Sequence, residues 1–319
     1  MNHSHETQLG GIDDQLAGLY GTRDGMPEKQ RIRYARLLET HIKTYSMTKR
    51  VLFVSAPGRT EICGNHTDHN RGKVLAAAVN LDTLAAVSAR PDTLVTIHSE
   101  GHPPVALDLA ELAQDESEHG SSTALVRGVA HWLHEHGFQL GGFDAVTTTT
   151  VSSGSGLSSS AAFEVLVCAI IGALYNNDTI GAVPRAQCAQ YAENVYFGKP
   201  SGLMDQMASS MGGLIAIDFK NDEPDIRAIP YDFAAKGYAL VVVRTGGSHD
   251  DLTHCYSAIP REMRAVANYF GKSVLREVPE ETFFQSIPAL LKSLAPDIRD
   301  RAILRAQHFY EENKRVDRM

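Results

Sequence analysis

Hydrophobic and polar positions along the chain follow two different periods, which predict a mixture of strands and helices. Residues 142–151 place β-branched or apolar side chains at alternate positions, as is typical of a strand. Residues 161–174 are apolar nearly all round, as in a helix buried at the centre of a domain. A run of glycine and serine at residues 152–160 separates the two segments. The pattern therefore predicts a strand, a glycine-rich loop and a buried helix in succession.

Further strands and helices alternate irregularly along the chain. Apolar patterns predict strands at residues 51–55, 83–89, 93–99, 213–219 and 238–244. Helical patterns occupy residues 31–45, 123–136, 185–196, 203–211 and 250–270, and a last one begins near residue 297. We expect Pro57 and Gly58 to break the strand at 51–55. This order favours an α+β fold in which helices cover mixed sheets.

The composition limits the class of protein. With 43% hydrophobic and 21% charged residues, the 319-residue chain can bury a large core, which we expect two domains to share. The net charge of -8 argues against nucleic acid or an anionic membrane as a partner. The sequence contains no apolar span of about 20 residues and no signal-peptide pattern, so we expect a cytoplasmic location.

The glycine and serine run has the features of a phosphate-binding loop. Gly154 and Gly156 let the backbone approach an anion closely, and Ser158, Ser159 or Ser160 can cap the following helix. The N–H groups of the first helical turn and the helix dipole favour a triphosphate. Such runs also form linkers, but the flanking strand and helix favour a binding loop. The Walker pattern of P-loop proteins does not occur in the sequence.

A dense polar motif lies at residues 56–72, after the first predicted core strand. A sugar needs paired donors and acceptors for its hydroxyl groups, and this motif offers Arg59, Asn65, His66, Asp68 and Asn70. A solvated loop is the alternative interpretation. A metal site built from His66, Asp68 and His69 is disfavoured, because adjacent residues on a turn seldom converge on one ion.

A third motif spans residues 193–213. Pro200 and Gly202 end one helix, and the next helix is expected to begin at Leu203. Asp205 then falls within the first turn, where the helix dipole stabilises a carboxylate. An acidic residue in such a position is often only a helix-end charge. Asp205 is therefore a candidate functional residue only because the sequence also contains the other two motifs.

Together the three motifs resemble those of galactokinases in the GHMP small-molecule kinase superfamily. The sugar-site signature of that family, GR-x-N-x-x-G-E-H-T-D-Y-N-x-G, is similar to Gly58-Arg-Thr-Glu-Ile-Cys-Gly-Asn-His-Thr-Asp-His-Asn-Arg-Gly72. The family's phosphate loop is similar to residues 154–161, its G-x-M-D-Q segment to residues 202–206, and a sugar-site tyrosine segment to residues 246–256. The motifs occur in the family's order, and the likeness runs from about residue 15 to the end of the chain.

The resemblance implies the two-domain GHMP kinase fold, of α+β class. An N-terminal extension and first helix would occupy residues 1–45. A domain similar to domain 2 of ribosomal protein S5 would follow at residues 46–228, and residues 229–319 would form part of a ferredoxin-like C-terminal domain. The family's third motif, which resembles G-A-G-x-G-G, has no match, and the chain ends within a predicted helix. We therefore expect a truncated reading frame in which the C-terminal domain is incomplete.

The resemblance also implies a reaction and the residues that perform it. The reaction is ATP-dependent phosphorylation of D-galactose at its anomeric oxygen, with Mg²⁺, by a monomer whose partners are its small substrates. Arg59 and Asp205 are assigned to the chemistry, and Ser160 and Glu193 to Mg²⁺, which prefers oxygen ligands. The resemblance assigns the sugar to Asn65, His66, Thr67, Asp68, Gly202 and Tyr256, and ATP to Ser99, Gly154, Ser155, Gly156, Leu157, Ser158, Ser159 and Ser160.

One departure from the family signature keeps other functions open. The glutamate before the histidine of the signature is Asn65 here, which keeps an acceptor oxygen, adds donors and removes a charge. A related kinase acting on N-acetylgalactosamine or another sugar is therefore an alternative. A non-catalytic regulator that binds sugar and ATP is a second alternative. It is disfavoured because the serine-rich loop and Asp205 are both retained.

Overall fold

The computed structural model describes residues 12–46, 50–152, 154–243 and 253–319, which form two compact units. The first unit contains the chain up to residue 58 and residues 79–152 and 158–201, and the second contains residues 59–78, 153–157 and 202–319. The units are discontinuous in sequence because strands β1 (Leu52–Cys63) and β2 (Lys73–Ala89) each run from one unit into the other. The domain boundaries expected at residues 45 and 228 remain predictions.

The first unit contains a mixed sheet in the order β4-β3-β5-β2. Strand β5 (Phe143–Thr149) pairs antiparallel with residues 83–89 of β2 and parallel with β3 (Leu94–Ser99). Strand β4 (Val105–Asp108) pairs antiparallel with β3. The α-helices among the described residues of this unit are α2 (Asp13–Tyr20), α3 (Met26–Tyr45), α4 (Ser122–Glu135), α5 (Ser159–Tyr175) and α6 (Ala182–Tyr191), and a π-helix at Ala192–Phe197 follows α6.

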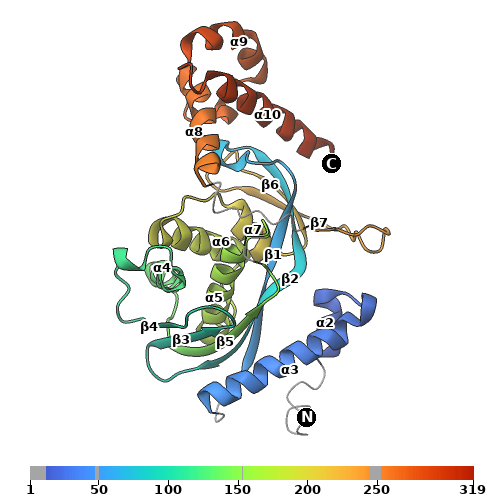
Figure 1. Ribbon diagram of the computed structural model, residues 1–319, viewed down its shortest axis with the longest axis vertical. Coiled ribbons are helices and arrows are strands. Elements are labelled where there is room, and N and C mark those ends of the chain that lie inside the picture. Colours follow the sequence, from blue (N-terminus) through green and yellow to red (C-terminus); the bar gives the residue numbers. More distant parts are fainter. Residues whose placement is uncertain (1–11, 47–49, 153, 244–252) are drawn as a thin grey trace. The chain divides into compact units, whose positions relative to one another are not determined.

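The two faces of this sheet are covered by different helices, as the alternation of strand side chains requires. Leu84 and Ala86 of β2 belong to a buried cluster with residues of α2 and α3. Ala85 and Val87 belong to another cluster, with residues of α4 and α5. Figure 1 shows these helices around the strands of the unit. The mixed α+β arrangement predicted from the sequence is therefore confirmed.

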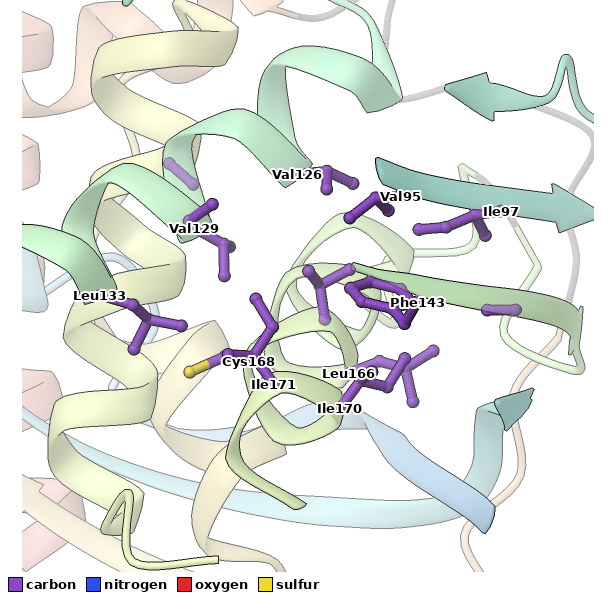
Figure 2. Close-up of a cluster of buried hydrophobic side chains, with 14 of the residues drawn as sticks. Val95, Ile97, Val126, Val129, Leu133, Phe143, Leu166, Cys168, Ile170 and Ile171 are labelled. Atoms are coloured by element: carbon purple, nitrogen blue, oxygen red, sulfur yellow. The ribbon is translucent and has the colours of Figure 1, made fainter. Parts of the chain in front are cut away.

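Helix α5 is buried nearly all round, as its composition predicts. Leu166, Ile170 and Ile171 are 0% exposed and lie in one cluster with Phe143 of β5 and Val129 of α4 (Figure 2). Burying each such side chain contributes about 1.5–3 kcal/mol. Helix α5 starts at Ser159, within the last residues of the glycine and serine run.

The second unit contains antiparallel strands and helices. Residues 73–77 of β2 pair with β6 (Leu214–Asp218), which pairs in turn with β7 (Asp225–Ile229). Helix α7 (Met204–Met211) precedes β6. Helices α8 (Thr253–Tyr269), α9 (Glu280–Ser293) and α10 (Arg299–Arg318) share a core that includes Phe283 and Phe309.

Two expectations for the strands are wrong. Strand β1 does not end at Pro57 and Gly58 but continues to Cys63. Proline is tolerated in a strand with one open side, and β2 is the partner that the described residues provide for β1. Residues 238–243 form no strand, and the last residue of that expected strand, Arg244, lies outside the described residues. Val241 and Val243 are 77% and 74% exposed, because an apolar segment forms a strand only beside a partner.

We predict that Ile170→Ala lowers the free energy of unfolding by about 2–5 kcal/mol, because the truncation leaves a cavity in a close-packed core. The measurement is urea unfolding followed by circular dichroism. Leu304→Ala on α10 is the control, since Leu304 is 64% exposed, and it should change the free energy by less than about 0.5 kcal/mol. Equal effects of the two substitutions would contradict the described burial.

Candidate functional site

Arg59 and Asp205 form a bidentate ion pair. Arg59 lies on β1, beyond the residues at which this strand was expected to end. Asp205 lies in the first turn of α7, as predicted. Arg59 Nε donates to Asp205 Oδ1 at 2.7 Å, and Nη2 donates to Oδ2 at 2.5 Å. The exposed fractions of the two side chains are 13% and 31%. Parallel charge-assisted hydrogen bonds of this kind fix both position and orientation, so the pair is held in one geometry.

Arg59 also binds the glycine and serine run. Its Nη1 donates to the carbonyl oxygen of Gly156 at 2.5 Å, and its backbone N–H donates to the carbonyl of Leu157 at 3.1 Å. Burial disfavours the charge of Arg59, but the charge and hydrogen bonds of Asp205, together with the charges of Glu61 and Asp68, outweigh that effect and raise the pKa of Arg59. Arg59 is therefore a permanent cation that joins the loop to Asp205.

The sugar-signature loop, residues 64–73, is shaped by its own backbone. Gly64 has φ +100°, and a side chain there would meet the backbone of Lys73 and Val74. Thr67 is 0% exposed, and its hydroxyl lies 2.9 Å from the carbonyl of Gly64 and 2.8 Å from that of Lys73. The hydroxyl of Thr67 is therefore used within the loop itself.

Asp68 and Gly202 lie in direct contact. Asp68 begins the short helix Asp68–Asn70, and its Oδ1 accepts a hydrogen bond from the backbone of His69 at 2.9 Å. A Cβ atom at position 202 would overlap the carboxylate of Asp68. Glycine at this position therefore admits the carboxylate, and two residues predicted for one site are adjacent.

His66 and Tyr256 also lie together, although they are far apart in the sequence. Their ring centroids are 5.5 Å apart. Burial lowers the pKa of His66, against the opposing effect of Asp68. The imidazole is therefore neutral at pH 7 and carries one donor and one acceptor. The preceding part of the tyrosine segment, residues 246–252, lies outside the described residues.

Glu61 is a member of this group that the motif analysis missed. Asn65 Nδ2 donates to Glu61 Oε2 at 2.9 Å. Burial and then the charge of Asp68 raise the pKa of Glu61 to about 7, while Arg59 opposes the shift. The strand itself carried the signal, because side chains two positions apart on a strand share a face and Glu61 follows Arg59 by two residues.

Helix α10 supports the sugar-signature loop from the C-terminal end of the chain. Glu312 Oε2 accepts hydrogen bonds from the backbone N–H groups of Gly64 at 2.9 Å and Asn65 at 3.4 Å. His308 Nε2 donates to the carbonyl of Asn65 at 2.8 Å. Although burial opposes ionisation of Glu312, these amide donors and the Arg315 cation lower its pKa. A charged carboxylate therefore holds the loop backbone.

The first unit holds a second polar cluster around Glu193. Ser160 Oγ donates to Glu193 Oε1 at 3.0 Å, and Lys199 Nζ lies 3.0 Å from the same oxygen. Ser160 lies in the first turn of α5, and the Glu193 side chain, in the π-helix, is 3% exposed. A hydroxyl beside a buried carboxylate suits a hard cation such as Mg²⁺, which takes oxygen ligands. The two residues predicted to bind magnesium are thus in contact.

The predicted phosphate loop contains several left-handed residues. Gly154, Gly156 and Ser158 have φ values of 71°, 76° and 57°. Ser158 is the N-cap of α5, but it makes no side-chain capping hydrogen bond, so the predicted cap is not of that kind. The remaining residues predicted to bind ATP are Ser155, Leu157, Ser159 and Ser99. Ser99 ends β3 and accepts a hydrogen bond from Thr147 Oγ1 at 2.8 Å.

No helix in the described ranges combines the length and the apolar character needed to cross a bilayer. The same ranges contain no cluster of three or more His, Cys, Asp or Glu residues that could hold a metal ion. A cation at Ser160 and Glu193 would therefore need oxygen ligands from water or substrate in addition.

Comparison with known families identifies two regions of the chain. Residues 39–89 match the galactokinase galactose-binding signature, and residues 123–213 match the N-terminal domain of GHMP kinases. The galactokinase of Streptomyces coelicolor is 37% identical over 270 residues, which cover 83% of this chain and 67% of the relative. That of Clostridium tetani is 30% identical over 288 residues, covering 88% of this chain and 70% of the relative.

Comparison with solved structures agrees with the fold. The crystal structure of Lactococcus lactis galactokinase complexed with galactose superposes with a TM-score of 0.72 at 24% identity. The superposed region covers 89% of this chain and 73% of the Lactococcus lactis galactokinase chain. Methanococcus jannaschii mevalonate kinase superposes with a TM-score of 0.50 at 12% identity. The chain spans about two thirds of the length of the curated relatives that it matches, from 64% to 70% among the galactokinases compared.

We predict a pH dependence of stability that comes from Glu61. Its carboxyl group has an ordinary pKa of 4.5 and a folded pKa of about 7, so the folded state binds more protons between these values. The contribution of Glu61 to the free energy of unfolding is therefore most favourable below pH 4.5 and is lost as the pH rises to about 7.

Glu61→Gln should remove this dependence. The measurement is the free energy of unfolding of wild type and variant from pH 4.5 to 8, with the exposed Glu281→Gln on α9 as the control. The difference between wild type and Glu61→Gln should change across this window, whereas the control should follow wild type. Parallel curves for all three proteins would show that the pKa of Glu61 is not raised.

Proposed function

Because this chain belongs to the galactokinase family of the GHMP kinases, we propose that it phosphorylates D-galactose with ATP to give α-D-galactose 1-phosphate, in galactose catabolism. The observation that carries the proposal is the Arg59 guanidinium, which binds Asp205 on one side and the Gly156 carbonyl on the other. One cation thereby links an acceptor carboxylate with the glycine-rich loop.

The chemistry follows from this pair. The anomeric hydroxyl oxygen attacks the γ-phosphorus of ATP and forms a new O–P bond, while the bond from the γ-phosphorus to the oxygen that bridges it to the β-phosphate breaks. ADP leaves with that bridging oxygen, and the hydroxyl proton passes to Asp205. Asp205 accepts the hydrogen bond of the attacking hydroxyl, and the bidentate ion pair with Arg59 holds the carboxylate in position. The positive charge of Arg59 also stabilises the charge on the transferring group. Phosphoryl transfer depends mainly on such positioning and charge neutralisation.

The sugar is proposed to bind the polar groups of the second unit. Neutral His66 offers a donor and an acceptor beside Tyr256, and Asp68 offers acceptor oxygens beside Gly202. Asn65 adds an amide. Thr67 serves this site through the shape of the loop, because its buried hydroxyl bonds loop carbonyl groups.

ATP and Mg²⁺ are proposed to bind the residues around the start of α5. Ser160 and Glu193 would hold the metal ion, which would neutralise phosphate charge when bound. The left-handed positions Gly154 and Gly156 shape the loop so that its backbone can face phosphate oxygens. We also propose that the protein is cytoplasmic, because its reaction consumes ATP.

One observation supports a second substrate. Asn65 replaces the glutamate of the signature, so the sugar contact at this position differs from that of the signature. N-acetylgalactosamine is therefore the alternative acceptor. An ADP-release assay with galactose, N-acetylgalactosamine and glucose separates the two, and ATP and sugar binding without ADP release would instead indicate a regulator.

We predict that Asp205→Asn lowers kcat for galactose by about 10²-fold or more, because it removes the acceptor of the hydroxyl proton. The Kd for ATP should stay within about twofold. Asp222→Asn in the same unit is the control, since Asp222 is 90% exposed. Undiminished turnover by Asp205→Asn would exclude Asp205 from the chemistry.

We predict that Ser160→Ala raises the Mg²⁺ concentration required for half-maximal activity by about tenfold, because an oxygen ligand is lost. The measurement is the initial rate against Mg²⁺ concentration at saturating galactose. Ser293→Ala at the exposed end of α9 should leave the curve unchanged. A Ser160→Ala curve that coincides with wild type would mean that this hydroxyl does not bind the metal ion.

A further inference from the structure

Glutamate and asparagine are interchanged at positions 61 and 65 relative to the galactokinase signature. The signature GR-x-N-x-x-G-E has asparagine two positions after the arginine and glutamate six positions after it. This chain has glutamate at the first of these positions and asparagine at the second. Each residue alone is a departure, but together they keep one carboxylate and one amide in the motif.

The two side chains are in contact, which gives the exchange a physical basis. Asn65 Nδ2 donates to Glu61 Oε2 at 2.9 Å. A carboxylate and an amide that bond each other can trade places on the two positions without loss of that hydrogen bond.

The other oxygen of the same carboxyl group is available to a ligand. Glu61 Oε1 is buried and has no hydrogen-bond partner among the described residues. A buried acceptor without a partner costs about 1–3 kcal/mol, and most such atoms in proteins are bonded. A ligand hydroxyl placed at Oε1 would remove this cost.

The surroundings of Glu61 are those of the proposed sugar site. The charges of Asp68, Arg59 and Asp205 all act on this carboxyl group, and burial together with Asp68 raises its pKa to about 7. At neutral pH the group exists both as carboxylate and as carboxylic acid, so it can accept a hydrogen bond or donate one. A sugar hydroxyl, which also does both, is the matching partner.

We propose that Glu61, oriented by Asn65, is a specificity-determining residue that binds a hydroxyl group of the acceptor sugar through Oε1. It supplies the carboxylate that the signature has at position 65. The inference rests on the proposed function, because it assumes that the acceptor is a hexose bound among Arg59, Asp68 and Asp205. A site that bonds a substrate hydroxyl rejects the deoxy analogue strongly, since the buried partner is then unpaired.

The test combines variants of Glu61 with deoxygenated sugars. Wild type, Glu61→Ala and the double exchange Glu61→Asn with Asn65→Glu are compared with galactose and its 2-, 3-, 4- and 6-deoxy analogues. Glu281→Gln, an exposed change of charge in the same unit, is the control. Sugar affinity is measured by titration calorimetry, KM and kcat by ADP release, and folding by the thermal unfolding midpoint.

The expected result is a coupling between one hydroxyl and Glu61. Glu61→Ala should weaken galactose binding about tenfold or more without change in the Kd for ATP. For one analogue the penalty seen with wild type should disappear in Glu61→Ala, because the lost partner is already absent. The double exchange should restore galactose affinity to within about threefold of wild type, and Glu281→Gln should behave as wild type.

Two results overturn the inference. One is a Glu61→Ala protein whose penalties for all four analogues equal those of wild type, because Glu61 then bonds none of these hydroxyls. The other is wild type that binds no hexose, which overturns the proposed function as well. Wild type that binds galactose but releases no ADP refutes the kinase proposal alone, since the calorimetric comparison still decides the role of Glu61.

Discussion

The ion pair between Arg59 and Asp205 is the interaction on which the rest of the candidate site depends. Its two hydrogen bonds join β1 to the first turn of α7, and a third joins the same guanidinium to Gly156. Burial of two charges is costly unless each is paired, and removal of either partner leaves the other uncompensated. The strand, the helix and the glycine-rich loop therefore hold one arrangement in which every charge of the pair is satisfied.

The sequence alone predicts most of the helices, strands and helix-end positions that depend only on neighbouring residues in the chain. The apolar run of α5, the strand before it and the first-turn position of Asp205 follow from periodicity and helix-end rules, and the structure confirms them. The extension of β1 through Pro57 was not predictable in this way, because it depends on which side of the strand is open. The opposite holds for residues 238–243, where the pattern predicts a strand but the structure has none, because no described strand pairs with them.

The site shows the same division between local and distant information. The motifs identified His66, Tyr256, Asp68 and Gly202 as candidates. The fold brings His66 into contact with Tyr256, and Asp68 into contact with Gly202. The motif analysis did not single out Glu61, although this residue stands at the asparagine position of the signature, and the raised pKa of Glu61 comes from burial and from neighbours in three dimensions. Thr67 matches the signature, but its buried hydroxyl is used in the loop, so a motif position does not distinguish a ligand contact from a structural one.

The carboxylate of Glu312 has a consequence for the order in which the protein can form. It bonds the backbone N–H group of Gly64 across 248 positions of the sequence. Contacts of such long range are costly to close and form late in folding. During synthesis, the polypeptide must emerge from the ribosome at least as far as Glu312 before the amides at Gly64 and Asn65 acquire this acceptor. The sugar-signature loop therefore acquires its full set of hydrogen bonds only after α10 has formed, even if β1 and β2 pair earlier.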